Sequence, residues 1–96
     1  MRRAARTDAN QSAIINALRG VGASVQDLSR VGQGCPDLLV GFRGRNWLLE
    51  VKDGSKNASD RKLTSDQMTW HRIWSGQKAV VMNEDEALRA IGAIKL

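Results

Sequence analysis

The middle of the chain, from Gly34 to Lys52, reads GCPDLLVGFRGRNWLLEVK. Two apolar runs, residues 38–42 and 47–51, are joined by the short polar segment 43–46, and this pattern predicts a β-hairpin. Both runs are almost continuously apolar, which predicts strands that are buried on both faces. We therefore expect the hairpin to form the centre of the fold.

Charged residues stand at the ends of these strands, where burial is costly unless they are paired or bind a metal. If the loop has two residues, Gly44 and Arg45, or four residues, Asp37 lies opposite Lys52. Asp37 and Glu50 are then diagonal neighbours on one face of the sheet. Two carboxylates so placed can bind one Mg²⁺ ion, with Lys52 beside it. An ion pair that closes the end of the sheet is the alternative explanation.

The rest of the chain supplies the elements around the hairpin. Capping residues, glycines and apolar spacing predict a helix from Thr7 or Asp8 to Gly20, a strand over 24–29, a loop over 53–62, a helix over 64–75, a strand over 78–82 and a helix over 83–91. The order α-β-β-β-α-β-α indicates an α/β fold in which helices flank a mixed sheet.

Composition limits the classes of function. A chain of 96 residues predicts one domain over residues 1–96, and the net charge of +5 suggests a polyanionic partner. The single Cys35 excludes an internal disulfide and fits a reducing compartment. We expect no signal peptide and no membrane association. Only four aromatic residues are present, which disfavours proteins that stack bases on an aromatic sheet: Phe42, Trp47, Trp70 and Trp74.

The hairpin residues resemble a known family. Pro36-Asp37, followed by Glu50-Val51-Lys52, resembles the PD-(D/E)XK nuclease signature. The wider context, GCPDLLV followed by LEVK, resembles its VRR-NUC branch, and above all the small stand-alone nucleases of bacteriophages. The resemblance extends from about Asp8 to Ile91. It implies a restriction-endonuclease-like αβββαβ core.

The resemblance also implies a chemistry, that of a metal-dependent endonuclease that hydrolyses phosphodiester bonds of DNA. Asp37, Glu50 and the main-chain carbonyl of Val51 would bind Mg²⁺, for which Mn²⁺ would substitute. Lys52 would act on the attacking water or on the phosphate. Gln67 resembles the glutamine that the family carries on the helix after the catalytic strands.

One position departs from the family pattern. Members commonly carry a glutamate on the first helix, and the counterpart here is Gln11. An amide binds a cation less strongly than a carboxylate, although Gln11 could still orient a metal-bound water. The alternative function is therefore a catalytically weak or inactive DNA-binding protein of the same fold. A structural domain whose basic surface serves only solubility is a third hypothesis.

The small members of this branch resemble Holliday-junction resolvases. This implies a homodimer that acts on branched DNA, such as a four-way junction, flap or fork, in the cytoplasm of a bacterial host and encoded by a phage or prophage. Basic residues that follow the catalytic strand or precede the first helix are candidates for phosphate contacts: Lys56, Arg61, Lys62 and Arg6. Residues 1–6 are expected to form a mobile basic arm.

Several residues also have simpler explanations. Gln67 completes a capping box with Thr64, so a cap and a role in the active site are both open. Trp70 and Trp74 are expected in the core or in a dimer contact. Arg43 and Arg45, at the hairpin tip, are expected to be exposed and remote from the catalytic strand ends.

Overall fold

The computed structural model describes residues 9–95, and the elements in this range follow the predicted order. The strands are β1 (Ser24–Asp27), β2 (Leu38–Phe42), β3 (Arg45–Val51) and β4 (Lys78–Val81). The helices are α1 (Gln11–Gly20), α2 (Ser65–Ile73) and α3 (Glu84–Ala90), with a 3₁₀ turn, η1, at Ala58–Arg61. Asp8, the predicted cap of the first helix, and the basic arm of residues 1–6 lie outside the described residues.

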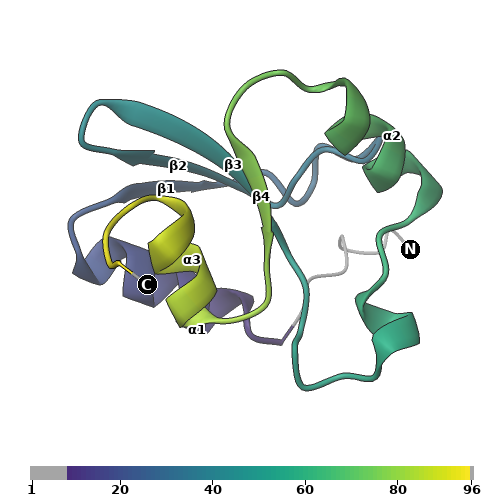
Figure 1. Ribbon diagram of the computed structural model, residues 1–96, viewed down its shortest axis with the longest axis horizontal. Coiled ribbons are helices and arrows are strands. Elements are labelled where there is room, and N and C mark those ends of the chain that lie inside the picture. Colours follow the sequence, from purple (N-terminus) through teal and green to yellow (C-terminus); the bar gives the residue numbers. More distant parts are fainter. Residues whose placement is uncertain (1–8, 96) are drawn as a thin grey trace.

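The four strands form one sheet in the order β1-β2-β3-β4. Neighbouring strands are antiparallel from β1 to β3, whereas β3 and β4 are parallel. In Figure 1, α1 and α3 lie together against one side of the sheet, and α2 and η1 lie towards the end opposite the hairpin turn. The predicted α/β fold with a mixed sheet and flanking helices is confirmed.

The core lies between the sheet and the pair α1 and α3. Successive side chains of a strand point to opposite faces, so alternate residues of β2 and β3 reach this core. Its fully buried members include Ile14, Leu18, Leu38, Val40 and Leu49. Both faces of the two hairpin strands were predicted to be buried. This prediction was wrong for the face that points away from α1 and α3, where Leu39 and Leu48 are only half-buried because no helix covers them completely.

The hairpin turn differs from the predicted one. Phe42 pairs with Arg45, so the two turn residues are Arg43 and Gly44, whose φ angles of 52° and 78° are typical of a tight turn with two left-handed residues. Leu38 pairs with Leu49, and the predicted register was therefore wrong by two residues. Because the loop is still even, the carboxylates of the two strands remain on one face.

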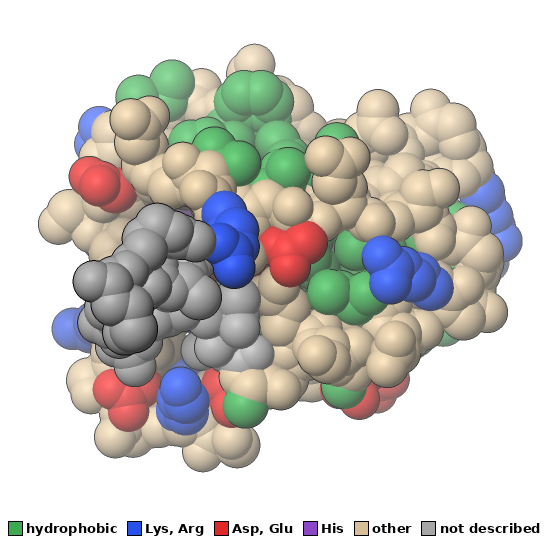
Figure 2. Space-filling model, turned by 180° about the vertical axis from the view of Figure 1, so that it is seen from behind, with side chains coloured by type: hydrophobic (Ala, Val, Ile, Leu, Met, Phe, Trp, Pro, Cys, Tyr) green, Lys and Arg blue, Asp and Glu red, His purple; other side chains and the backbone are tan. Residues whose placement is uncertain are grey.

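Large hydrophobic side chains remain exposed on α2 and in the loop before β2. They are Val31, Met68, Ile73 and Trp74. Figure 2 shows hydrophobic side chains gathered along the upper margin of one face, with charged groups scattered below. Trp70 and Trp74 stack on each other with ring centroids 4.9 Å apart, and neither belongs to the core, so the core alternative was wrong and the dimer contact stays a prediction. No helix within residues 9–95 has the length and apolarity to cross a membrane.

Candidate active site

The strand ends opposite the hairpin turn surround a pocket of about 430 Å³. Asp37 directly precedes β2, Glu50 and Val51 end β3, and Lys52 follows them. The helix α2 begins at the mouth of this pocket. Its lining consists of Asp37, Glu50, Val51, Lys52, Lys56, Ser59, Asp60, Lys62, Thr64 and Gln67. The sequence prediction that the hairpin carboxylates and Lys52 share one face corresponds to this pocket.

Hydrogen bonds of Asp37 connect the ends of β1, β2 and β3. Its Oδ2 accepts a hydrogen bond from the main-chain N–H of Val51 at 2.8 Å, and its own main-chain carbonyl accepts one from Leu28 at 2.6 Å. The N–H and C=O of one residue in an extended strand point to the same side. The Val51 carbonyl therefore lies on the side of Asp37, and the continued register sets Asp37 opposite Glu50.

Glu50 and Lys52 form a buried pair at the floor of the pocket. Glu50 is 2% exposed and Lys52 8% exposed, and Oε2 of Glu50 lies 3.8 Å from Nζ of Lys52. Ionised side chains are rarely buried without partners, since the cost of desolvation is several kcal/mol per ion. Their burial beneath an open pocket is therefore more typical of a functional site than of a stabilising ion pair.

Gln67 connects this pair to α2. Its Nε2 donates to Oε2 of Glu50 at 3.0 Å, and its Oε1 accepts from Nζ of Lys52 at 3.0 Å. The same Oε1 accepts from the main-chain N–H of Thr64, whose hydroxyl accepts from the N–H of Gln67. One side chain thus makes both the capping contact and the contacts with Glu50 and Lys52, and it fixes the start of α2 to these two charged groups. The active-site role of Gln67 stays a prediction.

Gly34 explains how α2 comes so close to the strand ends. Its φ is +80°, and a Cβ at this position would collide with the main-chain carbonyl of Asp66 and lie 2.9 Å from the nitrogen of Gln67. Only glycine allows the loop before β2 to pack directly against the first turn of α2. The glycine of the GCPD segment therefore helps to place Gln67.

The basic candidates divide into two groups. Lys56 and Lys62 line the pocket, and their contact with phosphates stays a prediction. Arg61 does not line it: the guanidinium donates to the main-chain carbonyl of Asn57 and approaches Sδ of Met82 at 3.8 Å. Arg6 lies outside the described residues.

Gln11 is buried beside the site and does not line the pocket. Its Nε2 lies 3.4 Å from Oδ2 of Asp27, a carboxylate at the end of β1 that the sequence analysis did not single out. Hydrogen bonds from Ser29 hold the pKa of Asp27 below its usual range, so this group stays ionised at neutral pH. The spacing of polar residues on β1 carried no signal that Asp27 would face α1.

Asn10 is a second residue that the sequence analysis missed. Its Nδ2 donates to the main-chain carbonyls of Lys52 at 3.1 Å and of Met82 at 2.8 Å. It therefore joins the start of α1 to the ends of β3 and β4, directly behind the pocket. A polar residue immediately before a helix predicts a cap, but here the side chain makes no cap and binds the sheet instead.

The surroundings of Cys35 and His71 favour the neutral form of both side chains. Burial, together with the nearby carboxylates of Glu50 and Asp37, raises the pKa of the Cys35 thiol, which keeps it protonated. Burial, with a smaller contribution from Lys78, lowers the pKa of His71. Neither residue lines the pocket.

The donor set of the pocket fits a magnesium ion. Within residues 9–95, no group of three or more His, Cys, Asp or Glu side chains is arranged to hold a metal. Asp37, Glu50 and the carbonyl of Val51 instead offer two carboxylates and one neutral oxygen. Mg²⁺ commonly binds through one or two carboxylates and keeps several waters, so this small all-oxygen set suits it better than it suits zinc.

Comparison with known proteins supports the fold. Neither protein-family models nor curated protein sequences give a match to this chain. A solved structure described as a VRR_NUC domain matches with a TM-score of 0.65 and 24% sequence identity. The alignment covers 92% of this chain and 100% of that chain. The chain therefore has the fold of a VRR_NUC domain, in agreement with the resemblance of its hairpin residues.

Proposed function

We propose that this protein is a magnesium-dependent endonuclease that hydrolyses phosphodiester bonds of DNA. The observation that carries the proposal is the pocket in which Asp37, Glu50 and Lys52 meet under the amide of Gln67. The VRR_NUC fold and the PD…EVK residues support it. The net charge of +5 is in keeping with a polyanionic substrate.

The residues of the pocket would divide the chemistry between them. Asp37, Glu50 and the carbonyl of Val51 would hold Mg²⁺, which supplies Lewis-acid activation of the phosphate and of a bound water. Lys52 Nζ, held in place by Gln67, would stabilise the negative charge that develops on the phosphate or assist the attacking water. Lys56 and Lys62 at the mouth would contact the flanking phosphates.

Branched DNA and a homodimer form the finer part of the proposal. The exposed hydrophobic residues Met68 and Ile73 of α2, and Trp74 directly after it, are in keeping with a protein contact on that side of the pocket. A dimer would place two cleavage sites on one substrate, as a four-way junction requires. Light scattering at micromolar concentration tests this, and an active monomer would contradict it. An Ile73→Glu variant is expected to separate the protomers.

A panel of substrates tests the activity. Linear, flapped, forked and four-way DNA, and a matched RNA duplex, are incubated with Mg²⁺, with Mn²⁺ and with EDTA. We expect metal-dependent cleavage within the strands of at least one branched DNA, and none in EDTA. Cleavage that persists in EDTA, or that is confined to RNA, would contradict the proposal.

A non-catalytic DNA-binding protein is the second candidate. It is favoured by Gln11, which stands where the family carries a glutamate and whose amide contacts Asp27 instead of the pocket. This candidate predicts salt-dependent binding to branched DNA without cleavage in either metal. The same panel therefore distinguishes the two functions.

A further inference from the structure

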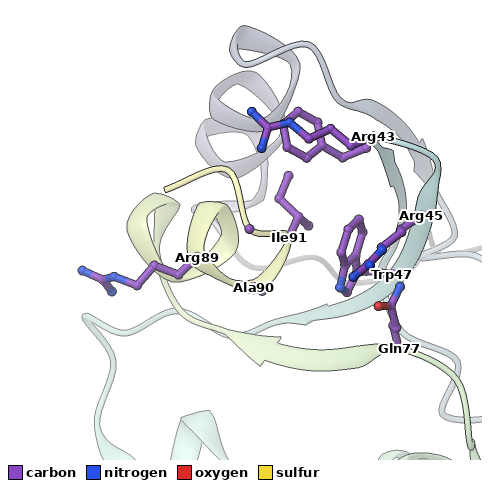
Figure 3. A pocket seen from close by; sticks show the side chains of 9 residues that line it. Arg43, Arg45, Trp47, Gln77, Arg89, Ala90 and Ile91 are labelled. Carbon is purple, nitrogen blue, oxygen red and sulfur yellow. The ribbon is translucent and has the colours of Figure 1, made fainter. Parts of the chain in front are cut away.

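A second pocket lies at the other end of the hairpin, between the turn and the end of α3. It has a volume of about 510 Å³. The turn and β3 form one wall, and Ala90, Ile91 and Gly92 form the other (Figure 3). The full lining is Phe42, Arg43, Arg45, Trp47, Gln77, Arg89, Ala90, Ile91 and Gly92.

The charge of this hairpin-tip pocket is entirely positive. Arg43, Arg45 and Arg89 line it, and no acidic residue does. Within the described part of the chain, none of the three guanidinium groups forms an ion pair. Arg43 instead lies over the ring of Phe42, 4.7 Å from the ring centroid. Arg89 also lines a neighbouring pocket that contains acidic residues, so the cluster without carboxylates consists of Arg43 and Arg45. Such a cluster favours a bound anion, above all phosphate.

The pocket also offers an aromatic wall. Trp47 is half-buried, and Figure 3 shows its ring beside Arg45 at the pocket wall, whereas the guanidinium of Arg89 extends away from the others. A volume of about 510 Å³ lies within the usual range for small-ligand clefts, so it can admit a nucleotide. Basic groups beside an aromatic ring are typical of sites that bind single-stranded nucleic acid.

The pocket is separate from the candidate active site. Arg45 begins β3 and Glu50 lies near its end, so about 17 Å of extended strand separates them. Trp47 and Glu50 also point to opposite faces of the sheet, because their positions differ by an odd number. A straight duplex seated on the carboxylates would therefore not fill the hairpin-tip pocket, whereas an unpaired strand that bends past the turn could reach it.

We propose that the hairpin-tip pocket binds an unpaired strand of nucleic acid, with Arg43 and Arg45 on its phosphates and Trp47 against a base. The inference rests on the proposed function for its choice of polyanion. At the stacked spacing of about 3.4 Å per nucleotide, the strand must extend at least about five nucleotides beyond the scissile phosphate to reach the pocket.

The test measures binding in EDTA by fluorescence anisotropy, so that its outcome does not depend on cleavage. The probes are a blunt duplex and the same duplex with 5′ or 3′ oligothymidine arms shorter and longer than about five nucleotides. Arg43→Gln combined with Arg45→Gln is expected to weaken binding of the long-armed duplex about tenfold. The slope of log affinity against log salt should fall by about 0.7 for each phosphate that the variant no longer neutralises. Binding of the blunt duplex should change less than twofold.

Arg72→Gln is the matched control, because Arg72 is exposed on α2 and lines neither pocket. Arg89→Gln should have a smaller effect than the double variant, since its guanidinium points away. An equal loss of affinity for blunt and armed duplexes, or no loss for either, would overturn the inference. The inference would also be overturned if thymidine monophosphate or inorganic phosphate alone competed as well as the armed duplex does at the same concentration. Arm-dependent binding without any cleavage would support the inference and reject the proposed nuclease activity. Cleavage without arm-dependent binding would support the nuclease activity and reject the inference.

Discussion

The two ends of β3 carry opposite kinds of polar site. At its end, Glu50 and Lys52 are buried, paired and held by Gln67, and the pocket around them has as many acidic as basic residues. At its start, Arg45 is exposed and lies with two other arginines in a pocket without carboxylates. Buried charges with fixed partners are typical of chemistry, whereas exposed charges of one sign are typical of electrostatic binding. Variants at each end test this difference.

The largest effect is expected at Lys52. Lys52→Gln keeps a polar group beside Gln67 and removes the positive charge, so single-turnover cleavage should fall by about 10²–10⁴-fold. Binding of the same DNA should weaken only severalfold, because the phosphate contacts at the mouth remain. Equal losses of cleavage and binding would indicate a structural lysine.

Gly34 should decide the stability of the end of the sheet that carries the candidate active site. Gly34→Ala adds a collision with Asp66 to the strain of a left-handed residue, which should lower the free energy of unfolding by about 2–4 kcal/mol. Gly32→Ala is the matched control, since Gly32 has the same φ of +80° and open space around it; its cost should be about 1–2 kcal/mol. Urea unfolding measures both. Equal costs would show that the contact with α2 does not matter.

The two roles of Gln67 can be separated by a pair of variants. Gln67→Met removes the hydrogen bonds to Glu50 and Lys52, together with the bond from the Thr64 N–H, and should slow cleavage about 10–100-fold, comparable to the loss of one fixed donor. Thr64→Ala removes the cap and should cost about 1 kcal/mol of stability with cleavage changed less than twofold. A comparable loss of activity in Thr64→Ala would mean that the cap, and not the bridge, serves the site.

The smallest effects compare the two ends directly. On a four-way junction with short blunt arms, Lys62→Gln should lower kcat/KM severalfold, because Lys62 lines the candidate active-site pocket. Arg45→Gln should leave the same kcat/KM within about twofold, since this substrate has no unpaired strand to reach the hairpin tip. Similar losses in the two variants would remove the distinction between the ends.

The sequence predicted most of the fold because the residues that begin and end helices and strands act locally. Glycines and capping residues mark the elements, and the structure confirms their order. The register was wrong because Gly44 suits either position of a two-residue turn. Gly44 occupies the second position, and the first position falls to Arg43 at φ 52°, with its guanidinium over Phe42. Residue spacing does not predict that Arg43 adopts this left-handed φ while its guanidinium packs on Phe42.

The candidate active site was predictable in part for the same reason. Asp37, Glu50 and Lys52 belong to one hairpin, so alternation along two strands was enough to bring them together. Asn10 and Asp27 were missed because their contacts join α1 to distant strands. The hairpin-tip pocket was missed because it forms where the turn meets the end of α3, far along the chain.

The central claim is that the buried end of β3 is a metal-dependent nuclease centre. Its most direct test is cleavage of branched DNA by the wild type, Glu50→Gln and the exposed control Asp85→Asn, each in Mg²⁺ and in EDTA. We predict cleavage by the wild type and Asp85→Asn in Mg²⁺ only, and a loss of at least about 10²-fold in Glu50→Gln with DNA binding retained. Cleavage by Glu50→Gln at the wild-type rate would contradict the account.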